Sequence, residues 1–205
     1  MEKKIEFIKK NKFLIILVIF TTILMLSNLG DRYIANDESF TALVGKTIVE
    51  GGYPHAYYNG ALINPKNTSY ITVDSASIYT WSTWLQEYIT AFMLLFGGGE
   101  FFLRLPFALF ALASMILSYF FIRDLTKNIT ITKISITLMA TSVVFYLHAR
   151  QLRWYGLVMF FGIAMLYSYW LLINDRKKAA LWFSLSSIFL FHCNYFIFFG
   201  VAFAL

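Results

Sequence analysis

Charged residues are scarce in this sequence, and their scarcity excludes an ordinary soluble domain. They make up 14% of the 205 residues, whereas 59% are hydrophobic and 20% are aromatic. Soluble domains usually carry about 25% charged and about 45–50% apolar residues. A soluble core of this size could not enclose the 22 Phe residues and the other apolar side chains. A bilayer could, so the composition predicts a membrane protein.

The sequence also has only one cysteine, and it lacks nucleotide-binding motifs and a basic patch. The single cysteine, Cys193, allows no disulfide within the chain and gives no information on the redox compartment. The sequence contains no Walker A motif, no Gly-x-Gly-x-x-Gly and no Cys-x-x-Cys. The net charge of +6 is spread over short clusters between apolar runs, which indicates membrane topology rather than a nucleic-acid partner.

Five apolar runs predict membrane-spanning helices, at residues 13–29, 102–122, 129–147, 154–173 and 179–205. Each approaches the roughly 20 residues that cross about 30 Å of hydrocarbon. No small-x-small cleavage site follows the first run, so we interpret it as an uncleaved signal anchor rather than a signal peptide. The last run continues to the end without a polar cap, as expected of a fragment of a longer protein. The predicted fold is all-α, a polytopic transmembrane helix bundle.

Residues 30–101 form the one substantial segment outside these runs. They contain seven acidic and three basic residues, with clusters of Gly, Pro and Asn that favour turns. We expect two helices in this segment, at residues 38–50 and 82–96, the first capped by Asn36 or Asp37. The second carries a Trp- and Phe-rich stripe interrupted by polar residues, which is typical of a helix that lies at the membrane interface.

The basic residues decide the predicted orientation of the chain. If residues 82–96 do not span, five N-terminal lysines, three basic residues at 123–133 and three at 176–178 share one side, eleven of the 17 in all. If residues 82–96 span, this bias is lost. The positive-inside rule therefore favours a cytoplasmic N-terminus in the cell (plasma) membrane, with residues 30–101 and 148–153 on the outer face.

Two polar sequences are thereby predicted to meet at the outer surface of the membrane. In Asp37-Glu38, adjacent acids can act as a general base or hold a divalent metal ion; the same pair could instead cap the helix that follows. The second sequence contains Arg150 and Arg153. Arginines can bind a phosphate, here a lipid phosphate, through paired hydrogen bonds, or they can anchor the chain at the lipid headgroups.

Other polar residues could join or stand apart from such a site. Arg104, at the start of the second run, could contact the same phosphate or act as an anchor. His55 could bind a metal together with acids, although a lone loop histidine is more often a surface residue. Asn194, deep in the last run, could face a cavity. Asn67-Thr-Ser matches a glycosylation acceptor, a short pattern that is expected by chance.

The order of these segments resembles the GT-C superfamily of integral-membrane glycosyltransferases, within it the protein O-mannosyltransferase and aminoarabinose-transferase-like group. The resemblance covers the whole chain and corresponds to the N-terminal part of such a protein. The matching sequences are Asp37-Glu38-Ser39-Phe40, Tyr58-Asn59-Gly60, Glu100-Phe-Phe-Leu-Arg104-Leu-Pro106 and Arg150-Gln-Leu-Arg153-Trp154-Tyr155.

This resemblance implies a polyprenyl-phosphate-linked sugar as donor, transferred on the outer face to a lipid, glycan or protein acceptor. It implies catalysis by Asp37 with Glu38 beside it. The expected donor-phosphate ligands are Arg150, Arg153 and Arg104, and the expected substrate contacts are Tyr58, His55, Trp154 and Tyr155. The sequence lacks the family's second acid near the arginines and its proline-rich stretch before the Trp-rich helix, so a metal requirement stays open.

Two other functions fit the same pattern. A non-catalytic membrane subunit of a glycan-assembly complex could use the aromatic outer loop to bind its partner. A lipid or solute transporter would need charged or broken helices near the middle of the membrane, whereas proline is absent from the interiors of the predicted spans.

Overall fold

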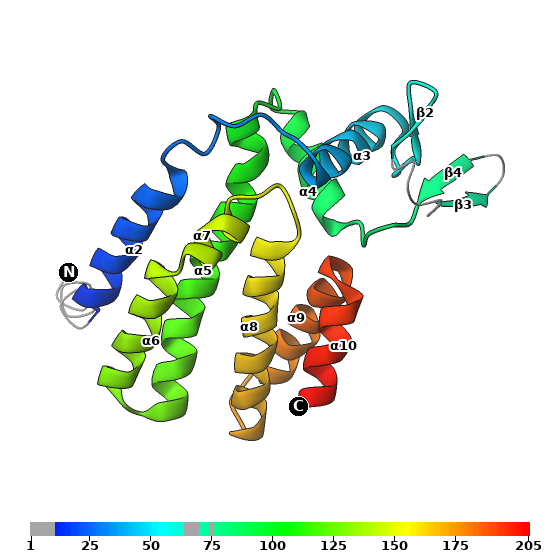
Figure 1. Cartoon of the computed structure of the whole chain (residues 1–205). Helices are drawn as coiled ribbons and strands as arrows, with labels where there is room; N and C mark the ends of the chain where they lie inside the picture. Colours follow the sequence, from blue (N-terminus) through cyan, green and yellow to red (C-terminus); the bar gives the residue numbers. More distant parts are fainter. Residues whose placement is uncertain (1–10, 64–69, 74–75) are drawn as a thin grey trace.

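A computed structural model describes residues 11–63, 70–73 and 76–205 of the chain. The predicted glycosylation pattern at Asn67 lies outside the described residues. The described chain is mostly helical, and its apolar helices lie beside one another in a bundle (Figure 1). The segment between α2 (Lys12–Leu26) and α5 (Glu100–Thr126) folds at one end of that bundle. We call this segment the loop domain.

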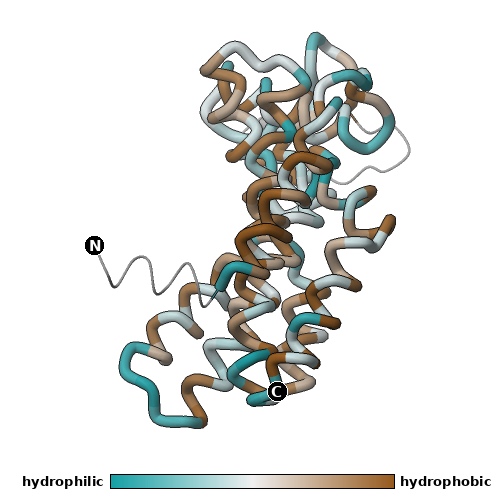
Figure 2. Tube along the Cα trace, turned by 90° about the vertical axis from the view of Figure 1, so that its left-hand side faces the viewer, coloured by the Kyte–Doolittle hydropathy of each residue, from teal (hydrophilic) through white to brown (hydrophobic). Residues whose placement is uncertain are grey.

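Two helices of the bundle, α5 and α8 (Tyr155–Ile173), are long and apolar enough to cross a membrane. A third crossing is added if α6 (Ile129–Thr141) and α7 (Val143–Ala149) form one bent span. The other apolar helices, α2, α9 (Ala179–Cys193) and α10 (Tyr195–Ala204), are shorter. Hydrophobic residues run along the helices, and hydrophilic residues gather at the lower connections and in the loop domain (Figure 2). The described helices thus include two or three candidate spans, and five spans stay a prediction.

The predicted span over residues 129–147 is not one straight helix, because the chain bends by 60° between α6 and α7. Ser142 has an extended backbone between the two helices, and its hydroxyl accepts a hydrogen bond from the backbone N–H of Phe145 at 3.3 Å. A serine in this role is an N-cap, which begins a new helix rather than continuing the old one.

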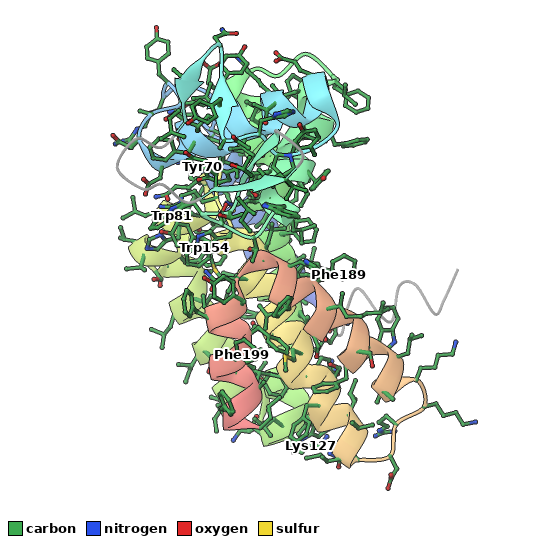
Figure 3. All side chains as sticks on the ribbon, turned by 90° about the vertical axis from the view of Figure 1, so that its right-hand side faces the viewer. Tyr70, Trp81, Lys127, Trp154, Phe189 and Phe199 are labelled. Atoms are coloured by element: carbon green, nitrogen blue, oxygen red, sulfur yellow. The ribbon has the colours of Figure 1, made fainter. Side chains whose placement is uncertain are left out.

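The predicted span over residues 179–205 is divided into two helices, α9 and α10. Asn194 is extended (φ −164°, ψ 106°), and its side-chain oxygen accepts a hydrogen bond from the N–H of Ile197 at 3.1 Å. The chain turns back at this N-cap, so α9 and α10 run in opposite directions (Figures 1 and 3). We call residues 193–195 the hairpin tip, and it faces the loop domain.

The start of α8 packs closely on α5. A Cβ atom on Gly156 would overlap the carbonyl oxygen of Phe107, so only glycine allows this approach of the two backbones. Leu103, Leu152 and Leu157 are buried with Phe107 at this crossing. The contact fixes the end of α8 that directly follows the arginine-containing sequence.

In the loop domain, α3 (Asp37–Gly51) and α4 (Leu85–Leu94) confirm the two predicted helices, the second in a shorter form. The expected side-chain cap of α3 is absent: neither Asn36 nor Asp37 caps it among the described contacts, and the Asn36 carbonyl accepts the Ser39 N–H at 3.0 Å instead. Four short strands, which the sequence did not predict, form two antiparallel hairpins: β1 (Tyr57–Tyr58) with β2 (Ala61–Leu62), and β3 (Tyr70–Val73) with β4 (Ala76–Tyr79).

The two helices of the loop domain are held at a short separation. A Cβ atom on Gly45 of α3 would lie 2.9 Å from the side chain of Thr90 in α4. Both residues are buried. Since Thr90 lies one turn after Gln86 and Glu87, this packing also fixes where those two side chains lie.

Candidate functional site

Asp37 and Arg153 meet, although 116 positions separate them in the sequence. Oδ2 of Asp37 accepts a hydrogen bond from Nη1 of Arg153 at 2.5 Å, and the two side chains are 57% and 23% exposed. Arg153 also lies 5.3 Å from the ring of Tyr155. The acid pair at the start of α3 and the arginine sequence before α8 therefore do lie on the same end of the bundle, as the topology prediction required.

Glu38 makes a second, more buried ion pair with Arg104 of α5. Nη2 and Nε of Arg104 donate to Oε2 and Oε1 of Glu38 at 2.6 and 3.0 Å. The side chain of Arg104 is 5% exposed and that of Glu38 is 14% exposed. Oε1 of Glu38 also accepts the backbone N–H of Leu152 at 2.7 Å. One carboxylate thus joins α3, α5 and the loop that holds Arg153.

The remaining donors of Arg104 point at backbone carbonyls. Its Nη1 donates to Leu29 and Arg32 at 3.0 and 2.7 Å, and its Nη2 donates to Tyr33 at 3.2 Å. All five N–H groups of the guanidinium are therefore occupied by protein atoms. This arrangement differs from the predicted one: Arg104 and Glu38 hold the site together, and neither has a free edge for a phosphate or an acceptor.

Arg150, three positions before Arg153, makes one side-chain hydrogen bond among the described contacts. Its Nη2 donates to the carbonyl of Ser27 at 2.6 Å. Burial lowers the pKa of the Arg150 guanidinium, and the positive charges of Arg32 and Arg104 lower it further. Several positive charges therefore lie close together, an arrangement that an anion would stabilise.

Two cavities flank the Asp37–Arg153 ion pair. The first, which we call the arginine cavity, has a volume of about 730 Å³ and lies where the α2–α3 connection faces α7 and the loop after it. Its charged lining residues are Asp31, Arg32, Asp37, Glu38, Arg104, Arg150 and Arg153. The second, the aromatic cavity, has about 550 Å³ and lies between the loop domain, the start of α8 and the hairpin tip. Asp37 and Arg153 line both cavities.

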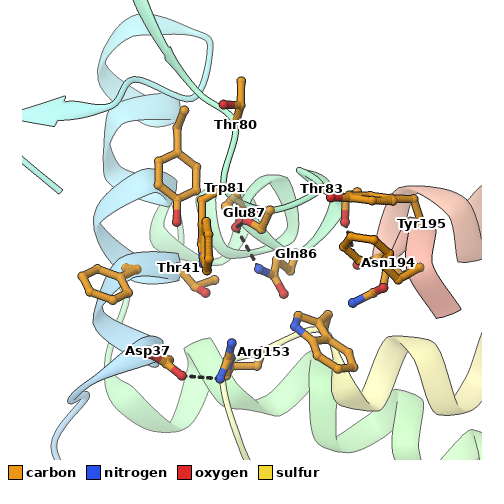
Figure 4. A pocket seen from close by; sticks show the side chains of 16 residues that line it. Asp37, Thr41, Thr80, Trp81, Thr83, Gln86, Glu87, Arg153, Asn194 and Tyr195 are labelled. Atoms are coloured by element: carbon orange, nitrogen blue, oxygen red, sulfur yellow. Dashed lines mark hydrogen bonds and ion pairs between the residues drawn. The ribbon is translucent and has the colours of Figure 1, made fainter. Parts of the chain in front are cut away.

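The aromatic cavity contains two buried polar residues that the sequence analysis did not single out. Gln86 and Glu87, in the first turn of α4, are 4% and 1% exposed. Oε1 of Glu87 accepts hydrogen bonds from Ser82 Oγ at 2.6 Å and from Gln86 Nε2 at 2.8 Å (Figure 4). Burial raises the pKa of Glu87 to about 7, although these two hydrogen bonds oppose the shift.

Of the predicted substrate contacts, Trp154 lines the aromatic cavity and Tyr155 lies against Arg153. His55 and Tyr58 do not reach the site. The ring of His55 lies 3.8 Å from that of Tyr53, and the backbone N–H of His55 donates to Thr47 Oγ1. Tyr58 packs against the core of the loop domain near Lys46. Neither residue lines either cavity, so their predicted role in substrate binding is not supported.

The described residues do not gather into a metal site. In residues 11–63, 70–73 and 76–205 no group of three His, Cys, Asp or Glu side chains could hold a metal ion. Comparison of the chain with models of protein families, with curated proteins and with solved structures gave no match.

Proposed function

We propose that this protein is a membrane glycosyltransferase that moves a sugar from a polyprenyl-phosphate-linked donor to an acceptor on the outer face of the membrane. One observation carries the proposal: the exposed carboxylate of Asp37 lies beside Arg153, and both residues line the arginine cavity and the aromatic cavity. A carboxylate can accept the proton of an acceptor hydroxyl, and a neighbouring guanidinium can bind the phosphate of a lipid-linked sugar.

The arginine cavity suits the phosphate of the donor. Arg150 and Arg153 line it and can each direct N–H groups at a phosphate oxygen. It lies at one end of a bundle that contains the membrane-crossing candidates α5 and α8. A phosphate at that level can be reached by a lipid whose chain stays in the bilayer. Figure 3 shows Trp154 and Trp81 near this level and Lys127 at the opposite end of the bundle.

In the proposed reaction, the acceptor oxygen forms a bond to C1 of the sugar while the bond from C1 to the phosphate oxygen breaks. Asp37 accepts the proton of the acceptor hydroxyl, so that the nucleophile is not left positively charged. The bonding electrons leave with the polyprenyl phosphate, and Arg153 and Arg150 neutralise the charge that develops on its oxygen. Glu38 and Arg104 hold these groups in place through the contacts to α3, α5 and Leu152.

The test is sugar transfer from a radiolabelled polyprenyl-phosphate sugar by membranes that contain the protein. Asp37→Asn should lower the rate by roughly 10²–10⁴-fold, the usual contribution of a general base. Glu50→Gln, at the exposed far end of the same helix, is the matched control and should retain activity. Full activity of Asp37→Asn at normal membrane insertion would contradict the catalytic assignment.

A specific feature favours transport as the second candidate function. The described helices contain breaks at Ser142 and Asn194, and broken apolar helices are common in transporters. A transporter would move a labelled lipid or solute across proteoliposomes without any transfer of sugar. Translocation that persists in Asp37→Asn and Arg153→Lys would favour this function over the first.

A further inference from the structure

The aromatic cavity has the size and the enclosure of a ligand site. Its volume of about 550 Å³ lies within the range of about 300–1,000 Å³ that is usual for small-molecule pockets. The hairpin tip closes one side, because Thr83 Oγ1 donates to the carbonyl of Cys193 at 2.6 Å and so joins the loop domain to α9. Asn194, beside that contact, also lines the cavity, and Figure 4 shows its side chain directed toward Gln86.

Two side-chain oxygen atoms of residues that line this cavity have no hydrogen-bond partner in the part of the chain that the structure describes. Oε2 of Glu87 and Oε1 of Gln86 are buried and accept no hydrogen bond from any residue that the structure describes. Both side chains are more than nine-tenths buried. Buried polar atoms are nearly always paired in folded proteins, so two unpaired acceptors side by side in one cavity indicate a ligand that supplies the donors.

The surroundings narrow the class of that ligand. Acceptors can be satisfied by a metal ion, an ammonium group or a hydroxyl group. No described cluster of acids, His or Cys suits a metal, and Asp37, the exposed carboxylate on the same cavity, already has Arg153 as its counter-charge. A neutral ligand with hydroxyl groups remains. The near-neutral pKa of Glu87 agrees with it, because burial favours the uncharged carboxyl, which can both donate and accept.

The aromatic residues of the cavity identify the rest of the ligand. Tyr79, Trp81, Trp154 and Tyr195 line it, and aromatic rings combine a flat apolar face with a polar edge. A sugar ring has the complementary pattern, with C–H groups on its faces and hydroxyl groups at its rim. We propose that the aromatic cavity is a carbohydrate-binding site in which Glu87 and Gln86 accept hydrogen bonds from hydroxyl groups of one sugar ring.

This inference deepens the proposed function, on which it rests only for the source of the sugar. That source is either the sugar of the lipid-linked donor or a sugar of the acceptor, and both present the same chemistry. In either case the sugar lies beside Asp37 and Arg153, which line the same cavity.

The experiment measures tryptophan fluorescence of the purified protein during titration with free glucose, mannose and galactose. At least one hexose should give a saturable change, and Glu87→Ala and Gln86→Ala should each weaken its apparent affinity by roughly tenfold or more. Glu87→Gln, which keeps the shape and can still accept a hydrogen bond, should weaken it less. Glu50→Gln is the control and should bind as the unmodified protein does. A thermal unfolding curve of each variant separates loss of binding from loss of folding.

Several outcomes would overturn the carbohydrate site: no saturable change with any hexose, an equal response to glycerol, or unchanged affinity in folded Glu87→Ala and Gln86→Ala. Saturating polyprenyl-phosphate sugar distinguishes the two sources. If it abolishes hexose binding while polyprenyl phosphate alone does not, the cavity holds the donor sugar; if hexose binding persists, it holds the acceptor sugar. Hexose binding without any transfer activity would reject the proposed function and leave the site intact.

Discussion

The carboxylate of Glu38 is the only charged partner that the described contacts give to the guanidinium of Arg104, and the pair is almost completely buried. Glu38→Gln should leave a buried positive charge without its counter-charge. The usual cost of such a change is about 3–5 kcal/mol of unfolding free energy. Thermal or denaturant unfolding of the detergent-solubilised protein measures it. Glu50→Gln, on the same helix but exposed, should change the stability little.

The close approach of α5 and α8 gives a second prediction. Gly156→Ala places a methyl group against the Phe107 carbonyl oxygen, and overpacking of this kind typically costs about 1–3 kcal/mol. Gly162→Ala lies six positions further along α8, where a Cβ would meet no atom within 4 Å. This control should be neutral or stabilising by up to about 1 kcal/mol, because alanine favours a helix more than glycine does. Equal melting temperatures for the two variants would contradict the described packing.

The buried carboxyl of Glu87 gives the stability a pH dependence. Its pKa is about 7 in the folded protein against an ordinary value of 4.5. Between these values the folded chain binds more protons than the unfolded chain. The contribution of Glu87 to the free energy of unfolding is therefore fully present below about pH 4.5 and is lost as the pH rises through about 7.

Glu87→Gln should remove this part of the pH dependence. Melting temperatures measured from pH 4.5 to 8 should decline less in the variant than in the unmodified protein, and the variant should be the more stable of the two above pH 7. In Glu50→Gln the melting temperature should change with pH as it does in the unmodified protein. The same result in Glu87→Gln would show that Glu87 titrates as an exposed acid does.

The orientation of the chain gives a fourth prediction. Gln151 and Lys177 lie beyond opposite ends of α8, which is long and apolar enough to cross a membrane. On a Cys193→Ser background, cysteines placed at Asn59 and Gln151 should react with a membrane-impermeant thiol reagent in intact cells, and one placed at Lys177 should not. Labelling at Lys177 with protection at Gln151 would reverse the predicted topology.

Patterns of hydrophobicity and charge predicted the parts of the fold that depend on local sequence. The periodicity of residues 38–50 predicted α3, and the apolar runs predicted α5 and α8. The bias of basic residues placed Asp37 and Arg153 on one side of the membrane, and the ion pair between them agrees with that placement. Each of these inferences needs only the composition of one segment and its neighbours.

The remaining features depend on contacts between distant segments. Arg104 resembles a phosphate ligand in sequence, but three carbonyl groups of residues 29–33 and Glu38 occupy its donors. In the sequence, Glu87 looks like an ordinary polar residue of an interfacial helix. Its burial depends on the packing of α3 against α4, which the sequence does not predict. The break at Asn194 could have been found, because asparagine is a preferred N-cap; the apolar residues on both sides concealed it.

The ion pair that borders both cavities links their occupancy. An anion in the arginine cavity that attracts Arg153 leaves the Asp37 carboxylate without its counter-charge, and so makes it available to a second molecule on the other side. Linkage requires the converse by the same factor: a molecule that engages Asp37 changes the affinity for the anion. A single side-chain pair that borders both cavities thereby couples them thermodynamically, so that occupancy of one changes the affinity of the other.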